Sequence, residues 1–338
     1  MKLFLEDGAS GYGEALPREY VTDETAESVF GKLCGVLPRR AMKVRFSSFR
    51  KGIDFLDSFK ELEGSARSAF ELALLDGLGK YFGKSFSDIV GPPAKNFLFA
   101  SGAISAGSVP AVAKDALALK AFGFKSVKVK VGSGNDLNIL NVVRKILGPK
   151  ADIRVDANCA WGAEEAVKRI EEMRRFGVRV IEQPVRPYDL RGLKKVTESV
   201  SETIVADESL SSVNDAQKLA RMKACGMFNI RISKCGGVLN ALKIVSIARR
   251  NSIRYQLGCQ VGESGLLSAA GRHFAFGVEG IEYFEGSYGK FLLKEDITKE
   301  DMTIGFGGKV RPVSGPGLGV TVIDRILEKY TGKKTVVS

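Results

Sequence analysis

The sequence has little of the chemistry that builds structural zinc sites, disulfide frameworks or membrane spans. Its five cysteines are scattered without a CxxC pair, and a single histidine occurs among 338 residues. This pattern disfavours structural zinc and disulfides, and it is typical of free thiols in a reducing compartment. No apolar run reaches the roughly 18 residues that a transmembrane helix needs. The opening MKLFLEDGAS also has no apolar stretch long enough for a signal peptide, so we expect a cytoplasmic protein with no membrane contact.

The sequence carries a strong positive charge, but nothing in it indicates nucleic-acid binding. The chain has 51 Lys and Arg against 39 Asp and Glu, a net charge of +12 at pH 7. It has no basic stripe interleaved with aromatic residues and no known nucleic-acid motif, so we expect no nucleic-acid partner. A solvated basic surface is the simpler interpretation, and its field would help to gather anionic carboxylate substrates.

What the sequence does have is a regular series of strand-like runs that contain charged residues near their ends. The runs are SVKVKV (126–131), IRVDAN (153–158), RVIEQP (179–184), IVADES (204–209) and NIRISK (229–234). Equivalent charged positions recur about every 26 residues, the length that a strand, a helix and two loops require. The spacing therefore predicts a (β/α) barrel, whose active site lies at the carboxyl ends of its strands.

Three carboxylates and three amines are the chemical content of these runs. They are Lys128, Lys130, Asp156, Glu182, Asp207 and Lys234. Any one of the acids taken alone could equally be a solvated residue at a strand end. Three of them, one barrel unit apart, favour a hard divalent cation such as Mg²⁺, which takes oxygen ligands and keeps positions open for water or substrate. Two of the lysines are two residues apart on one strand and so face the same side, which is either the barrel mouth or an exposed face.

Taken together, these motifs resemble the enolase superfamily, and within it the muconate-lactonizing-enzyme subgroup. The matching pieces are Lys128-x-Lys130, Asp156-x-Asn158, Glu182-Gln183-Pro184, Asp207-Glu208-Ser209, Lys234 before Cys235-Gly236-Gly237, and GPGLGV at 315–320. Each piece alone is weak, but all of them occur in order over about residues 10–330.

The resemblance implies an α/β fold, a (β/α)7β TIM-like barrel with an N-terminal α+β capping domain. We expect the capping domain at 1–95, the barrel at 96–290, and a segment at 291–338 that returns to the cap. The first strand of the barrel is expected at 97–105. Enolase-like caps usually begin with a further strand and a mobile loop, so this protein either lacks that lid or is a chain shortened at its N-terminus.

Within the expected cap, MKLFLEDGASGYGEA should form a hairpin with its turn at Glu6-Asp7-Gly8. Residues 24–37 and 65–83 should form helices, and the second of these has a face of small residues. After strand six, the barrel should continue with strands at 253–260 and 281–286.

The resemblance also implies a function, an Mg²⁺-dependent isomerase that removes a proton α to a carboxylate of a small substrate. Asp156, Glu182 and Asp207 would hold Mg²⁺, with Mn²⁺ as an alternative. Lys130 and Lys234 would be the acid/base groups on opposite faces of the substrate. Lys128 would help to offset the charge of the enediolate.

Several reaction types remain possible for an enzyme of this predicted function. A cycloisomerase or a racemase/epimerase is expected first, and a dehydratase resembling o-succinylbenzoate synthases is the alternative. A catalytically silent, carboxylate-binding protein of the same fold is the alternative from another class. Members of the family also lead us to expect a homo-oligomer.

Three further residues are candidates for contacts around the site. Asn158 would hold a metal-bound water or shape a turn, and Glu208 would orient a lysine or form a structural salt bridge. Glu263, in GCQVGESG (258–265), would belong either to the site or to the structure of its loop.

Two family variants do not match this sequence. Relatives that resemble mandelate racemase need a histidine base late in the barrel, but the only histidine, His273, is expected to pack on a helix near the barrel wall. Dipeptide epimerases have Asp-x-Asp on strand eight to hold the substrate ammonium, whereas this chain has Glu282-Tyr283-Phe284-Glu285.

Overall fold

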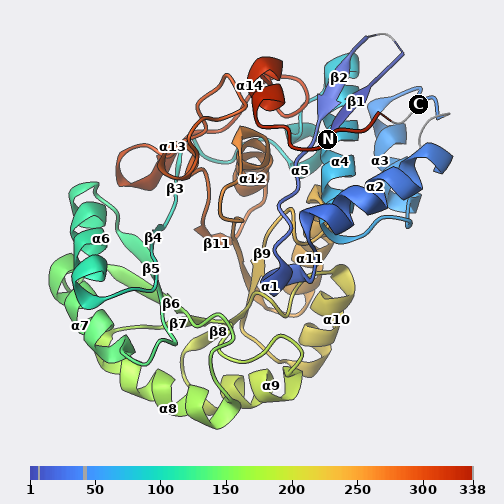
Figure 1. The fold of residues 1–338 in the computed structure, drawn as a ribbon. Coiled ribbons are helices and arrows are strands. Elements are labelled where there is room, and N and C mark those ends of the chain that lie inside the picture. Colours follow the sequence, from blue (N-terminus) through green and yellow to red (C-terminus); the bar gives the residue numbers. More distant parts are fainter. Residues whose placement is uncertain (7, 41–43, 337–338) are drawn as a thin grey trace.

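The computed structural model describes residues 1–6, 8–40 and 44–336. Figure 1 shows a ring of strands inside a layer of helices, with the N-terminal elements in blue and the C-terminal segment in red lying together beside it. Within the described residues, no helix is long and apolar enough to cross a membrane.

Eight parallel strands form the barrel, and they pair in the order of the chain. They are β4 (Gly102–Ile104), β5 (Ser126–Lys130), β6 (Asp152–Asp156), β7 (Val180–Glu182), β8 (Thr203–Ala206), β9 (Met227–Ile230), β10 (Arg254–Leu257) and β11 (Ile281–Phe284). A parallel bridge between Ala100 and Phe284 joins the last strand to the chain just before β4. The Ser101 N–H also donates to the Phe284 carbonyl at 2.9 Å. The predicted (β/α)7β barrel is therefore confirmed.

Seven helices connect these strands and cover the outside of the ring. They are α6 (Val109–Ala121), α7 (Asp136–Leu147), α8 (Ala163–Met173), α9 (Leu190–Ser199), α10 (Val213–Met222), α11 (Val238–Arg250) and α12 (Gly265–Gly277), with the 3-10 turn η1 (Arg174–Phe176) after α8. Ser212 caps α10 by accepting the Asp215 N–H, and Asp189 caps α9 by accepting the Gly192 N–H. The apolar faces of these helices are buried against the strands; for example, Ile139 of α7 is fully buried.

The N-terminal elements form a hairpin and a group of helices. They are β1 (Lys2–Phe4), β2 (Ser10–Tyr12), α1 (Glu19–Thr22), α2 (Ala26–Arg40), α3 (Phe49–Ser58), α4 (Gly64–Phe82) and α5 (Ser87–Val90). The two strands pair antiparallel, as expected, although Asp7 of the predicted turn lies outside the described residues. The long helix α4 is buried along 65–79. The helix α3 has no counterpart in the sequence prediction.

The C-terminal segment crosses back over these elements. It contains α13 (Gly289–Leu292), the turn η2 (Phe306–Gly308), β12 (Lys309–Val310) and α14 (Asp324–Lys329). Asp324 accepts hydrogen bonds from the Tyr12 hydroxyl at 2.8 Å and from Lys2 at 2.9 Å, which ties α14 to the hairpin. The division of the chain into domains at residues 95 and 290 stays a prediction.

Each predicted strand from 126–131 onward ends one to four residues earlier in the structure, such as the run 253–260 at Leu257, and two predicted strands need separate comment. The run 97–105 is divided: β3 (Leu98–Phe99) pairs antiparallel with β12, and the part from Ala100 onward pairs with barrel strands. Likewise, the run 229–234 does not remain extended to its end, because β9 ends at Ile230 and a turn follows. In the first case the competing partner is β12, which alternation of residues does not reveal. In the second case the chain turns on itself, because the Cys235 N–H donates to the Arg231 carbonyl and the Gly237 N–H donates to the Ile232 carbonyl.

The hairpin packs on α4 through two of its own glycines, Gly11 and Gly13. A Cβ on Gly11 would overlap the Ala73 carbonyl oxygen, and one on Gly13 would overlap that of Ala69. Neither glycine has a positive φ. The requirement for glycine is therefore the close approach of two backbones.

We expect Gly11→Ala to lower the free energy of unfolding by about 1–3 kcal/mol, since an added methyl group in a packed contact forces the backbone to shift. Gly31→Ala is the matched control, because Gly31 lies inside α2 with open space around it. That change should raise stability by about 0.5–1 kcal/mol through the helix propensity of alanine. Urea unfolding measures both, and equal midpoints for the two variants would contradict the packing argument.

Candidate active site

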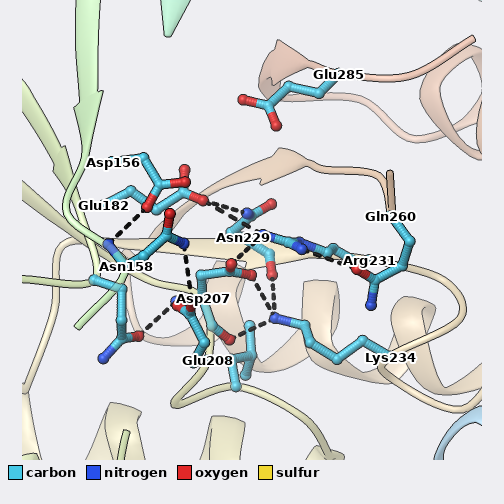
Figure 2. Close-up of polar contacts among 12 residues, drawn as sticks. Asp156, Asn158, Glu182, Asp207, Glu208, Asn229, Arg231, Lys234, Gln260 and Glu285 are labelled. Carbon is cyan, nitrogen blue, oxygen red and sulfur yellow. Dashed lines mark hydrogen bonds and ion pairs between the residues drawn. The ribbon is translucent and has the colours of Figure 1, made fainter. Parts of the chain in front are cut away.

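The three predicted carboxylates lie at the carboxyl ends of three adjacent strands. Asp156 and Glu182 are the last residues of β6 and β7 and pair in register, and Asp207 directly follows β8. All three are buried, with at most 2% of each residue exposed. Figure 2 shows the three side chains converging on one region at the barrel mouth.

The backbone beside these carboxylates is strained, and one glutamine joins the ends of two of their strands. Asn158, Cys159 and Gln183, which are not glycines, have left-handed φ values of 41°, 66° and 38°. The Gln183 side-chain oxygen accepts the N–H groups of Asp207 at 2.9 Å and Ser209 at 3.1 Å. The glutamine of the Glu-Gln-Pro motif thus fastens the end of β7 to the end of β8.

Lys128 lies among the acids rather than on an exposed strand face. Its ammonium is 3.2 Å from Glu182, 2.8 Å from Glu285 and 3.6 Å from Asp156. Burial disfavours the charged lysine, but these carboxylates outweigh burial and hold the pKa of Lys128 well above its usual value. Lys128 is therefore a fixed positive charge shared by three acids.

Arg231 and Lys234 hold Asp207 from the other side. Arg231 contacts Asp207 Oδ2 and lies 3.7 Å from Glu182, and Lys234 donates to Asp207 Oδ1 at 2.7 Å. Lys234 is fully buried and also donates to the Asn229 carbonyl at 3.2 Å. Although burial opposes ionisation, these two cations lower the pKa of Asp207.

Lys130 makes a separate series of contacts. It includes Asn158 and Glu208, which the sequence analysis named as candidates for contacts around the site. The Lys130 ammonium donates to Asn158 Oδ1 at 2.5 Å, and Asn158 Nδ2 donates to Glu208 Oε1 at 3.0 Å. Burial raises the pKa of Glu208 to about 7. Asn158 and Glu208 thus orient the amine on the β5 side.

Glu263 does not join this group by direct contact. It accepts the N–H of Gln260 at 2.7 Å, and burial raises its pKa to about 8. Gln260 in turn accepts from Arg231 at 3.0 Å, which links the loop after β10 to the acids. His273 packs away from the barrel mouth. Its ring contacts the Ser87 hydroxyl and the Leu318 carbonyl, each at 3.2 Å.

Sequence reasoning missed a layer of residues beneath the acids. Asn229 and Gln256 donate to the two oxygens of Glu182 at 2.9 and 3.0 Å. Arg154 donates to Gln256 at 2.7 Å and to Glu285 at 3.1 Å. Arg154 could have been found from the sequence. It lies two positions before Asp156 on the same strand, and residues two apart on a strand face the same side.

The carboxylates are not grouped as a finished metal site. Among the described residues, no three His, Cys, Asp or Glu side chains are close enough to hold an ion as they stand. Burial raises the pKa of Glu182 to about 8; Lys128 opposes this shift, and the neighbouring acids add to it. The assignment of the three acids as ligands stays a prediction.

Without added divalent cation, stability should depend on pH through Glu182. Its folded pKa, about 8, is above its usual value of 4.5, so between these values the folded state binds a proton that the unfolded state releases. The free energy of unfolding should therefore fall as pH rises from about 5 to 8, and Glu182→Gln should remove this component. Denaturant titrations of both proteins across this range measure it. Parallel pH profiles would contradict the shift.

The comparisons with known proteins agree with the geometry. The model of the family described as enolase C-terminal domain-like matches residues 111–326. An L-Ala-D/L-Glu epimerase of Clostridium acetobutylicum is 30% identical over 328 residues, covering 96% of this chain and 90% of the relative. An N-succinyl-L-Arg/Lys racemase of Bacillus cereus is 26% identical over 340 residues, covering 100% of this chain and 91% of the relative.

A solved structure shows the same fold with a metal ion and a dipeptide present. It is a dipeptide epimerase from Enterococcus faecalis complexed with Mg and the dipeptide L-Leu-L-Tyr, with a TM-score of 0.82 and 26% identity. The alignment covers 95% of this chain and 90% of that one. The relatives are epimerases and racemases, which confirms the prediction of an isomerase. The chain belongs to the enolase C-terminal domain-like family, within the enolase superfamily.

Proposed function

We propose that the protein is an Mg²⁺-dependent epimerase or racemase of N-acylated amino acids with a free carboxylate. The activities for which the relatives are named support this substrate class. A dipeptide and an N-succinyl amino acid share one feature, an α-carbon between a carboxylate and an acylated nitrogen. The proposed reaction removes the proton from that carbon and returns it on the opposite face.

The observation that carries this proposal is the placement of two amines around the acids. Lys130 ends β5, and Lys234 follows β9. Four strand positions separate β5 from β9 in the ring of eight, so the two lysines approach the mouth from opposite sides. An α-carbon held between them would have one amine on each face. Epimerisation needs this arrangement, because one group removes the proton while the other delivers it.

The residues present fit a divalent cation. Asp156, Glu182 and Asp207 offer hard carboxylate oxygens from three adjacent strands, which is the ligand chemistry of Mg²⁺. The buried oxygens Glu208 Oε2 and Asn229 Oδ1 also have no hydrogen-bond partner. When bound, Mg²⁺ would supply positive charge next to the substrate carboxylate. Mn²⁺, which prefers similar oxygen ligands, would substitute for it.

Lys128 would add to this electrostatic stabilisation. Its raised pKa keeps it protonated at neutral pH, so it is suited to neutralise charge on a substrate oxygen rather than to act as a base. The proton transfers are therefore left to Lys130 and Lys234.

The acids on and directly after β11 favour a substrate whose acyl group has no free ammonium. Glu282 accepts from Arg254 at 2.8 Å, and Glu285 is paired with Lys128 and Arg154. Each already has a cationic partner, so neither is placed to hold a dipeptide ammonium. We therefore propose N-acyl amino acids such as N-succinyl derivatives ahead of dipeptides. A homo-oligomer and the absence of a nucleic-acid partner stay predictions.

In D₂O with Mg²⁺, the protein should exchange the α-proton of N-succinyl-lysine faster than that of the dipeptide L-Ala-L-Glu. Mass spectrometry of the recovered substrate gives both rates. A faster rate for the dipeptide would overturn the proposed acyl preference. No exchange with either substrate would overturn the proposed reaction.

Each lysine should serve one face. Lys130→Ala and Lys234→Ala should each reduce exchange from one enantiomer by about 10²–10⁴-fold, the usual contribution of a general acid or base. Lys125→Ala is the control, because this exposed lysine precedes the amino end of the same strand β5. It should keep the rates of the unchanged protein. Normal exchange of both enantiomers by both active-site variants would exclude the two-lysine mechanism.

A further inference from the structure

We infer that Glu71, on helix α4 of the N-terminal part, is a positioning residue that sets the place of Lys234. Its carboxylate Oε1 accepts the N–H of Leu239 at 3.0 Å, in the first turn of α11. Glu71 is fully buried, although it belongs to no strand or helix of the barrel. This inference rests on the proposed function, in which Lys234 transfers a proton.

The glycines that follow Lys234 make this contact possible. Gly237 has φ +105°, and a Cβ there would overlap the Glu71 carboxylate. Gly236 has φ +81°, and a Cβ there would lie 3.5 Å from both the Arg67 side chain and the Gly64 carbonyl. Gly237 therefore does more than form a turn, since the absence of a side chain there lets Glu71 of α4 approach the backbone beside the lysine. Gly236 needs glycine for its positive φ, because contacts of 3.5 Å are ordinary.

The turn between β9 and α11 is short enough to transmit this contact. The Cys235 N–H donates to the Arg231 carbonyl and the Gly237 N–H donates to that of Ile232, both at 2.9 Å. At the other end, the Lys234 ammonium is fixed on Asp207 at 2.7 Å. A shift of α11 away from Glu71 would therefore move the backbone of Lys234 relative to the carboxylate that holds its side chain.

Burial raises the pKa of Glu71 to about 7, while Arg67 and the N–H groups at the start of α11 favour its ionised form. A carboxylate at the start of a helix interacts favourably with the partial positive charge of the first N–H groups. Arg67 lies 3.6 Å from Glu71 Oε2, but its guanidinium donates to the carbonyls of Phe59 and Leu56 instead. Oε2 has no hydrogen-bond partner, so the carboxylate makes its hydrogen bond with the helix that follows Lys234.

Glu14 provides a matched control in the same part of the chain. It accepts the N–H groups of Ser264 at 2.9 Å and Leu267 at 3.1 Å, at the start of the next barrel helix, α12. The loop before α12 contains neither of the two proposed proton-transfer lysines. Loss of Glu14 should thus loosen the contact between the N-terminal part and the barrel without a selective effect on Lys234.

The test compares Glu71→Gln and Glu71→Ala with Glu14→Gln and Glu14→Ala in two measurements. The first is α-deuterium incorporation into each enantiomer of N-succinyl-lysine, with kcat and KM. The second is reductive methylation of Lys234, followed by peptide mass spectrometry, which needs no catalytic activity. Lys234 is fully buried in the structure, so slow methylation is the starting point.

Glu71→Ala should lower kcat about 10- to 100-fold for the enantiomer whose exchange requires Lys234, because small displacements of a catalytic group have large effects. KM and the other enantiomer should change little. Glu71→Gln should recover part of the loss, because its amide oxygen still accepts the N–H. Lys234 should be methylated faster in both variants. The Glu14 variants should affect both enantiomers equally and leave Lys234 protected.

Equal loss for both enantiomers in the Glu71 variants, with Lys234 as protected as in the Glu14 variants, would overturn the inference. If the unchanged protein exchanges no α-proton, the proposed function fails, and the methylation rates alone decide whether Glu71 positions Lys234. If Glu71→Ala does not fold, the comparison of Glu71→Gln with Glu14→Gln decides.

Discussion

Buried negative charge at the mouth of the barrel is the constraint on which the rest of the site depends. Five acidic residues meet there: Asp156, Glu182, Asp207, Glu208 and Glu285. Buried carboxylates are costly unless cations or hydrogen-bond donors compensate them. Lys128 and Arg231 each contact more than one of these acids, and Lys234 contacts Asp207. The cations fix the directions in which the acids point.

Glu182 is the centre of this arrangement. It is in contact with Lys128 and Arg231 and accepts hydrogen bonds from Asn229 and Gln256, yet its pKa is still raised. A divalent cation beside it would favour its ionised form, in the same way that any nearby positive charge favours a carboxylate. The electrostatics of the protein and the proposed metal chemistry thus agree on the same place.

The sequence predicted the barrel and its mouth because both depend on local regularities. Charged residues about one barrel unit apart gave the strand ends, and the structure has Asp156 and Glu182 in register, as that spacing requires. Arg231 and Glu285 were not predicted as partners of these acids. Their contacts join residues far apart in the chain, and such pairings leave no periodic signal in a single sequence.

The position of Lys234 illustrates the same limit. The alternation of the run 229–234 favoured a continuous strand, but the structure ends β9 at Ile230 and places the lysine in a turn. The turn places Gly237 next to Glu71 of α4. The sequence shows two adjacent glycines after the lysine, but only the folded chain shows what approaches them.

The most direct test of the account is the position of a bound cation. Crystals grown with Mn²⁺ and measured near the manganese absorption edge should show one anomalous peak bound by Asp156, Glu182 and Asp207, with Lys130 and Lys234 on opposite sides of it. Bond lengths should be near ~2 Å, as for octahedral oxygen sites. A peak at another place, or a peak that only one of the three acids can reach, would contradict the account.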